Sequence, residues 1–125
     1  MSWKKCEYEE IRKLKSEYLL TLRWEEPEKC ETIRKYEIDN RPIAFIKTAP
    51  DPDKEQTIWI KEFEVIIPKK RQGYGKKAIA EYLNEVNVDV SILAKNKCVQ
   101  SFWEKCGFID DGITWAEIPM VYKTR

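Results

Sequence analysis

The fold is decided by residues 57–93, which read TIWIKEFEVIIPKKRQGYGKKAIAEYLNEVNVDVSIL. Residues 57–67 are rich in β-branched and aromatic side chains and predict a strand. The alternation breaks around residues 63–67, which indicates a bulge or a fully buried end. Residues 88–93 predict a second strand, and a helix between the two strands is indicated by the spacing of Ala78, Ile79, Tyr82, Leu83 and Val86. A strand–helix–strand step of this kind predicts a right-handed parallel crossover.

Before this stretch, the pattern predicts one helix and one hairpin. Apolar residues recur at helical spacing over residues 7–24, at Tyr8, Ile11, Leu14, Tyr18 and Leu22, and Pro27 ends any continuation. Residues 31–49 predict a hairpin with its turn at residues 39–42, and residues 49–53 read as a plain connecting loop.

After the crossover, the pattern predicts a helix over residues 96–105 that is terminated by Gly107. A last hairpin is predicted over residues 108–122, with the Asp-Gly pair at residues 111–112 supplying the turn. The order of elements gives one α+β domain over residues 1–125, with a mixed, mostly antiparallel sheet flanked by helices.

Composition excludes several classes of protein. The 125 residues contain 42% hydrophobic and 36% charged residues, enough for one core beneath a charged surface. The 23 basic and 22 acidic residues nearly cancel, which argues against a dedicated nucleic-acid or membrane-surface binder. No apolar run spans a bilayer, and the first residues do not read as a secretory signal. We therefore expect a cytoplasmic protein.

The chain contains no histidine, so any proton transfer must use carboxylates, Tyr, Lys, Cys or water. The four cysteines, at positions 6, 30, 98 and 106, are not spaced as Cys-x-x-Cys, and we expect them to be reduced packing residues. No metal site is predicted.

The basic turn KKRQGYGKK at residues 69–77 is the strongest functional signal. Gly73 and Gly75 allow close approach of a ligand, and the first amides of the following helix favour an anion such as a diphosphate. The turn matches neither a P-loop nor the G-x-G-x-x-G dinucleotide motif. Taken alone, a solvated surface turn explains it equally well.

Three motifs together resemble the GNAT superfamily of acyl-CoA-dependent N-acyltransferases, over roughly residues 31–123. They are EFEV at residues 62–65, KRQGYG at residues 70–75, and the helix that runs from Asn96 to FWEKCGF at residues 102–108. Lys70 stands where the family usually has Gln or Arg, and Trp103 stands where it usually has Tyr. The first 30 residues are shorter than the family's usual two opening helices.

This resemblance implies acetyl-CoA as co-substrate and a sheet whose parallel strand pair splays apart. The pyrophosphate role falls on the turn at residues 70–76, that is, on Lys70, Arg71, Gln72, Gly73, Tyr74, Gly75 and Lys76. The pantetheine arm would pair with the backbone of Glu64, Val65, Ile66 and Ile67, and the Val65 amide would polarise the thioester carbonyl. Asn96, Phe102 and Trp103 would lie on the cofactor side, although Asn96 as a helix cap and Trp103 as core are competing explanations.

The resemblance also implies a carboxylate base for the acceptor amine, and Glu62 and Glu64 are the candidates. We expect only one of them to face the cleft unless a bulge intervenes, and we slightly favour Glu62. Trp103 cannot protonate the leaving thiolate as a Tyr would, because indole only donates a hydrogen bond.

The sequence leaves three functions open. The first is an N-acetyltransferase acting on a small-molecule or peptide amine by direct attack in a ternary complex. The second is a CoA-binding sensor or interaction domain that has lost transfer, and the third, disfavoured by the net charge, is a nucleic-acid module using the basic turn. Many relatives are homodimers, and the sequence does not decide whether this chain is one.

Overall fold

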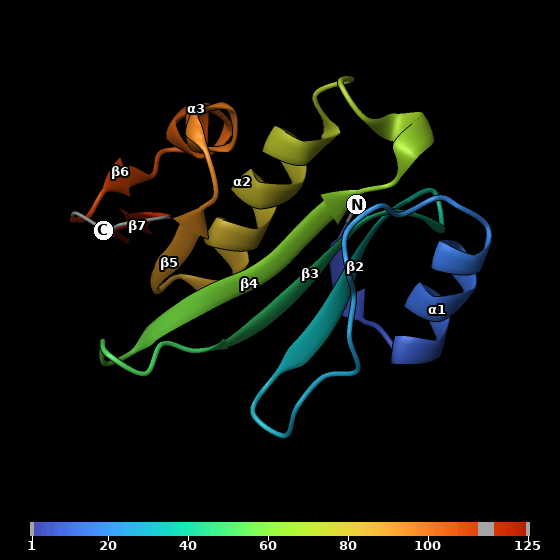
Figure 1. Cartoon of the computed structure of the whole chain (residues 1–125), viewed down its shortest axis with the longest axis horizontal. Coiled ribbons are helices and arrows are strands. Elements are labelled where there is room, and N and C mark those ends of the chain that lie inside the picture. The colour runs from blue at the N-terminus through green and yellow to red at the C-terminus, as the bar shows by residue number, and fades with distance from the viewer. Residues whose placement is uncertain (1, 113–116, 125) are drawn as a thin grey trace.

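The computed structural model describes residues 2–112 and 117–124. These residues form a mixed sheet of seven strands in the order β1-β2-β3-β4-β5-β7-β6, with three α-helices (Figure 1). Along the chain the elements are β1 (Ser2–Lys5), α1 (Tyr8–Ser16), β2 (Thr32–Ile38), β3 (Arg41–Pro50), β4 (Thr57–Val65), a short 3-10 helix (Ile67–Lys69), α2 (Tyr74–Val86), β5 (Asp89–Ala94), α3 (Lys97–Lys105), β6 (Ile109–Asp110) and β7 (Ile118–Tyr122). The predicted fold class is confirmed.

Among the paired strands that the structure describes, only β4 and β5 are parallel, and they pair over a short distance. The ladder extends from Thr57 opposite Asp89 to Trp59 opposite Ser91, although β4 continues to Val65. Beyond Trp59 the two strands are not paired, so the sheet opens between them. The helix α2 makes the crossover from one strand to the other, as the sequence predicts.

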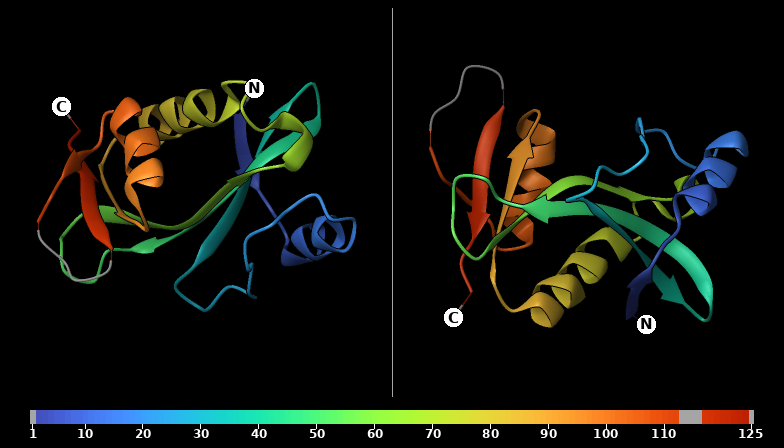
Figure 2. Two further views of the ribbon diagram at one scale, coloured as in Figure 1. Left: turned by 45° about the horizontal axis from the view of Figure 1, so that its top comes forward. Right: turned by 90° about the horizontal axis from the view of Figure 1, so that it is seen from below.

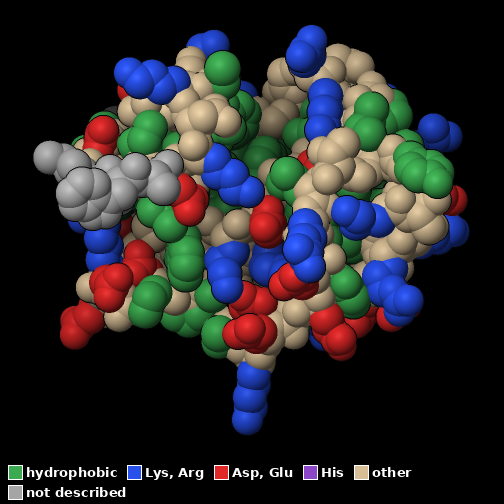
Figure 3. All heavy atoms as spheres, in the orientation of Figure 1, with side chains coloured by type: hydrophobic (Ala, Val, Ile, Leu, Met, Phe, Trp, Pro, Cys, Tyr) green, Lys and Arg blue, Asp and Glu red, His purple; other side chains and the backbone are tan. Residues whose placement is uncertain are grey.

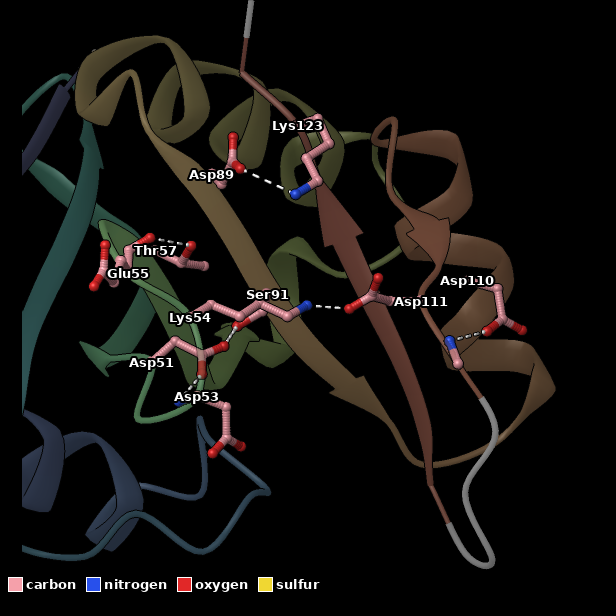
Figure 4. A network of polar contacts seen from close by, with 11 residues as sticks. Asp51, Asp53, Lys54, Glu55, Thr57, Asp89, Ser91, Asp110, Asp111 and Lys123 are labelled. Carbon is pink, nitrogen blue, oxygen red and sulfur yellow. Dashed lines mark hydrogen bonds and ion pairs between the residues drawn. The ribbon is translucent and has the colours of Figure 1, made fainter.

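At its paired end, this strand pair is held by polar contacts with neighbouring segments (Figure 4). The Ser91 hydroxyl donates a hydrogen bond to Asp51 at 2.6 Å, which ties the loop between β3 and β4 to β5. Lys54 pairs with Asp111, and Lys123 pairs with Asp89 at 3.2 Å. These contacts close one end of the β4–β5 pair, and the opening is confined to the other end.

Helices cover both faces of the sheet (Figure 2). On one face, α2 and α3 bury the larger core, to which Ile79, Tyr82 and Trp103 belong. On the other face, α1 covers a smaller core that contains Ile11 and Phe45. The sheet is therefore the middle layer, with helices on both of its faces (Figure 2).

The predicted helix over residues 7–24 is wrong in length, because α1 ends at Ser16. Tyr18 adopts a left-handed conformation with φ of 59°, and the amides of Tyr18 and Leu19 bond the carbonyls of Lys15 and Leu14 at 3.0 Å. This is a Schellman ending made without glycine. The apolar residues after it still reach the smaller core, but from an extended segment.

Two features at the ends of the sheet differ from the sequence prediction. The strand β1 was not predicted; in it the Trp3 indole nitrogen donates to the carbonyl of Ala78 at 2.8 Å and anchors β1 beneath α2. In the last hairpin, Ile109 pairs with Val121, so the connection is longer than a two-residue Asp-Gly turn. Residues 113–116, which were predicted to belong to its second strand, lie outside the described residues.

The other predicted elements are present, although β4 ends at Val65 and β3 begins at Arg41, inside the turn predicted over residues 39–42. The hairpin over residues 31–49 has Asp39 and Asn40 at its turn, both with positive φ, as a type I′ turn requires. Asn96 caps α3, and Gly107 follows it with φ of 98°. In the described parts of the chain, no helix is both long and apolar enough to cross a membrane.

Candidate functional site

The opening between β4 and β5 leads into a cleft of about 750 Å³. Its walls are the end of β4, the end of β5, the turn before α2 and residues 98–103 of α3, together with Thr21 and Leu22. In Figure 3 this face of the molecule is hollowed, with hydrophobic side chains in its depth and Lys and Arg side chains around it.

The structure brings ten of the predicted site residues to this cleft and leaves five outside it. Those that line it are Glu62, Glu64, Val65, Lys70, Arg71, Gly73, Gly75, Lys76, Phe102 and Trp103. Those that do not are Ile66, Ile67, Gln72, Tyr74 and Asn96.

The glycine turn presents the start of α2 to the cleft. Gly73 precedes the helix in a left-handed conformation, with φ of 82°, and no side chain among the described residues caps the helix there. The first amide to bond back within the helix is that of Lys77, which reaches the Gly73 carbonyl at 3.3 Å. The amides of residues 74–76 are therefore left for another acceptor, and the helix dipole makes an anion favourable there.

Gly75 sets how closely α2 approaches the far wall of the cleft. A Cβ atom at this position would lie 3.1 Å from a ring carbon of Phe102 and 3.5 Å from a methyl carbon of Val65. The Phe102 ring stacks on Phe63, with centroids 5.9 Å apart. Only glycine leaves this part of the cleft free.

The end of β4 exposes part of its backbone to the cleft. The Ile66 amide bonds the Ile43 carbonyl at 2.9 Å, on the β3 side. Backbone groups alternate in direction along a strand, so those of Val65 and Phe63 face the opening instead. This is the edge to which an extended ligand could pair.

Ile66 and Ile67 cannot offer the backbone pairing that the resemblance implied, because their polar groups are already used. The Ile66 amide bonds Ile43, and the Ile67 amide bonds the Leu19 carbonyl at 2.9 Å. Their carbonyls accept from Lys69 and Lys70 at the 3-10 helix. The predicted pairing is therefore wrong for these two residues, since β4 ends at Val65, two residues before its predicted end.

Three other predicted residues serve the local structure. The Gln72 amide group donates to the Pro68 carbonyl at 2.8 Å, and the Tyr74 ring packs against the larger core. The Asn96 side chain accepts a hydrogen bond from the Val99 amide at 3.0 Å, so the competing explanation, a helix cap, describes its contact in this structure.

Glu62 and Glu64 both line the cleft, so the expectation that only one would is wrong. Residues two apart in a strand share a face, and the bulge lies before both of them, at Lys61. Their surroundings, however, differ strongly.

Glu64 is buried, and its carboxylate is hydrogen-bonded. Its carboxylate accepts hydrogen bonds from the Thr21 amide at 2.6 Å, the Thr21 hydroxyl at 2.7 Å, and the Leu22 amide and Trp24 indole at 3.0 Å each. Burial alone would raise the pKa of Glu64, but these hydrogen bonds outweigh it, and the pKa is lowered. Glu64 therefore holds the segment of residues 21–24 against the sheet as a carboxylate.

Glu62 is half-buried, and among the described residues its carboxylate takes part in no hydrogen bond or ion pair. Burial raises the pKa of Glu62, and Glu64 and Glu25 add to this, while Lys95 and Lys47 oppose it. A carboxylate that is free of partners and has a raised pKa is suited to accept a proton.

Trp103 belongs mainly to the core. It is 6% exposed and packs edge-on against Phe63 and Phe108. This burial agrees with the competing explanation given for it from the sequence, core packing, and Trp103 also lines the cleft.

Several residues that line the cleft were not found from the sequence. Thr21 and Leu22 reach it from the segment predicted as helix, Lys95 from the β5–α3 connection and Cys98 from the first turn of α3. No local pattern marks these residues, because only the tertiary contact with β4 brings them here. Lys69 also lines the cleft, and its basic neighbours in the turn were the available signal.

Comparison with known proteins agrees with this geometry. The sequence matches the model of the acetyltransferase (GNAT) family over residues 1–108. The chain belongs to the GNAT family. None of the curated protein sequences compared with it gives a significant match.

GNAT proteins are also its structural neighbours. A protein of Bacteroides thetaiotaomicron assigned to the GNAT family superposes with a TM-score of 0.77 at 14% identity, covering 100% of this chain and 88% of the other. The ribosomal-protein-S18-alanine N-acetyltransferase of Escherichia coli gives 0.72 at 14% identity, over 97% and 92%. A Bacillus subtilis acetyltransferase in complex with CoA gives 0.65 at 12% identity, over 78% and 79%. At these identities, the likeness concerns the GNAT fold.

Proposed function

We propose that this GNAT protein is an N-acetyltransferase that moves an acetyl group from acetyl-CoA to a primary amine by direct attack in a ternary complex. The observation that carries the proposal is the cleft between β4 and β5, which joins a helix start suited to an anion to the carboxylate of Glu62, which has no partner among the described residues. Membership in the GNAT family and a CoA-bound structural neighbour support the choice of co-substrate.

The cofactor would lie along the cleft with its charged end at α2. The amides of residues 74–76 and the side chains of Lys70, Arg71 and Lys76 suit a pyrophosphate. The pantetheine arm would pair with the free backbone of Phe63 and Val65. The Val65 amide would then lie beside the thioester carbonyl, where it can stabilise a developing oxyanion.

In the chemical step, the acceptor amine gives a proton to Glu62, directly or through one water, and its nitrogen attacks the thioester carbon. The tetrahedral intermediate collapses with cleavage of the carbon–sulfur bond. The electron pair leaves with sulfur as the CoA thiolate, which takes its proton from solvent. A thiol pKa of about 8.5 makes the thiolate an adequate leaving group, so Trp103 in place of an acid does not block the reaction.

The test has two stages. First, titration calorimetry and thermal melting with acetyl-CoA measure cofactor binding. The proposal is refuted if acetyl-CoA gives no binding heat and no shift in Tm. Second, CoA release is measured over a panel of primary amines. We expect Glu62→Gln to lose roughly 10²–10⁴-fold in kcat, while the matched control Glu104→Gln, at an exposed position on α3, keeps wild-type activity.

A CoA-binding sensor without transfer is the second candidate, favoured by the buried Trp103 at the place usual for an acid. It predicts that acetyl-CoA binds normally and that no amine of the panel gives CoA release above the rate without amine. Amine-dependent release that disappears in Glu62→Gln would exclude it.

The acceptor is proposed only as a class, a small-molecule or peptide amine. The Escherichia coli neighbour is named for acetylating an alanine of a ribosomal protein, which is a peptide acceptor. Cytoplasmic location stays a prediction from the sequence, and the sequence does not decide whether the chain forms a homodimer.

A further inference from the structure

A group of charges lies beside Glu62 and is not used by the reaction described above; Glu31 and Lys47 have buried side chains, and Lys61 is exposed. The side chain of Glu31 is 4% exposed, and its carboxylate pairs with the Lys61 ammonium group. The same carboxylate lies 3.9 Å from the Lys47 ammonium group and accepts a hydrogen bond from the Glu28 amide at 2.9 Å. Lys47, itself buried, also donates to the Glu25 carbonyl at 2.8 Å.

These two lysines occupy the positions that frame Glu62 in the sheet. In the β3–β4 ladder, Lys47 lies directly opposite Glu62, whereas Thr48 lies opposite Ile60. Lys61 is therefore the extra residue of a bulge in β4, immediately before Glu62. Glu31 thus binds both the bulged residue and the cross-strand neighbour of Glu62.

The charge arrangement explains why Glu62 is left free. Opposed residues of an antiparallel pair have Cβ atoms about 4.5–5.5 Å apart, so the Lys47 side chain could reach the Glu62 carboxylate. In the structure Lys47 turns instead to Glu31 and the Glu25 carbonyl. The other charges that act on Glu62 are Glu64 on β4, Glu25 on the segment before β2 and Lys95 after β5.

We propose that Glu31 is a positioning residue: its buried carboxylate keeps Lys47 and Lys61 away from Glu62 and fixes the bulge that places Glu62 in the cleft. Without Glu31, Lys47 would be a buried cation with no carboxylate partner, a costly state that pairing with Glu62 would relieve. A paired Glu62 would be a weaker base and would be less free to meet the acceptor. This role in catalysis rests on the proposed function, but the effect on Glu62 does not.

The experiment measures the pKa of Glu62 directly, by carbon NMR of the side-chain carboxyl groups over a pH titration. We expect Glu31→Gln to lower the pKa of Glu62, because two lysines lose their partner and turn to it. Glu31→Asp keeps the charge one methylene farther away and should give a smaller shift in the same direction. In the double variant Glu31→Gln with Lys61→Met, the pKa of Glu62 should move part of the way back to its wild-type value.

Glu10→Gln is the matched control. It removes another carboxylate paired with a sheet lysine, Lys35, but lies on α1 away from the cleft. The pKa of Glu62 should not change in this variant, which separates a specific effect of Glu31 from a general effect of removing an ion pair.

The second readout is the acetyltransferase activity, measured with acetyl-CoA and the amine of the panel that gives the fastest CoA release. In Glu31→Gln the acidic limb of the kcat profile should move to lower pH. The loss in kcat should be smaller than the roughly 10²–10⁴-fold that the base contributes, and KM for acetyl-CoA should be unchanged. Glu31→Asp should restore most of the wild-type profile.

The outcomes are distinct. If Glu62 keeps its wild-type pKa in folded Glu31→Gln, the role of Glu31 is refuted; should that variant not fold, an unchanged pKa in Glu31→Asp refutes it instead. A wild-type protein that does not bind acetyl-CoA refutes the proposed function and leaves the measured link between Glu31 and Glu62 standing.

Discussion

Replacing Glu64 by Gln should destabilise the fold strongly, although the change removes only a charge. Five donors converge on the Glu64 carboxylate: the Thr21 amide, the Thr21 hydroxyl and, at 3.4 Å, the Lys70 ammonium group on one oxygen, and the Leu22 amide and Trp24 indole on the other. Whichever way the Gln amide is turned, its NH₂ group faces at least two of these donors. Two charge-assisted hydrogen bonds are then lost in a buried site, at about 1.5–3 kcal/mol each.

The expected loss is therefore about 3–6 kcal/mol, a large part of the 5–15 kcal/mol that holds a typical domain folded. At roughly 3–6 °C per kcal/mol for a chain of this size, Tm should fall by at least about 10 °C. Thermal unfolding followed by calorimetry or circular dichroism at neutral pH measures this fall in Tm. A fall of less than about 2 °C would refute the reasoning, because it would mean that the segment of residues 21–24 does not depend on this carboxylate.

Glu62→Gln is the matched comparison at the next position on the same strand face. Burial raises the pKa of Glu62, so its ionised form is disfavoured by folding, and removing the charge should leave Tm unchanged or slightly higher. For Glu64 the folded pKa is lowered, so its contribution to stability is present above the unfolded pKa and is lost as pH falls through the folded pKa. The gap in Tm between wild type and Glu64→Gln should accordingly narrow in acid.

Three further predictions concern other parts of the molecule. Gly75→Ala should weaken acetyl-CoA binding measured by calorimetry, because the new methyl carbon meets Phe102 at 3.1 Å inside the cleft; unchanged affinity would show that the cofactor does not pass there. Tyr18→Gly should stabilise the protein by about 1 kcal/mol in urea unfolding, since the left-handed conformation suits glycine and the ring is 85% exposed; a loss of stability would contradict this. Acetyl-CoA should slow alkylation of Cys98, which lines the cleft, and leave the exposed Cys30 as reactive as before, as peptide mass mapping can measure.

The crossover was predictable from the sequence because local and global signals agree there. Strong β-formers at residues 57–65, a glycine turn and apolar residues at helical spacing each point to one element, and β4, α2 and β5 follow. The glycine turn could be assigned to an anion for the same reason, since the chemistry of a helix start is local.

The ends of elements and the roles of the two glutamates could not be predicted. Periodic apolar residues continue past Ser16, but the Schellman ending there depends on Tyr18 taking a conformation that its sequence does not signal. Glu62 and Glu64 look alike in the sequence, and only tertiary contacts distinguish them. Glu64 meets Thr21 and Trp24, more than 35 residues away along the chain, whereas Glu62 meets no partner among the described residues.

The strand order also bears on how copies of this protein could associate. The sheet ends in β1 on one side and β6 on the other, and an uncovered outer strand can recruit a strand from a second chain. Here β6 is only two residues long, and β1 carries Lys4 and Lys5, both exposed. Short edge strands and exposed lysines on an edge strand both oppose pairing with a strand of a second chain. Any self-assembly should therefore use the helical surfaces, and a sheet continuous from one molecule to the next is not expected.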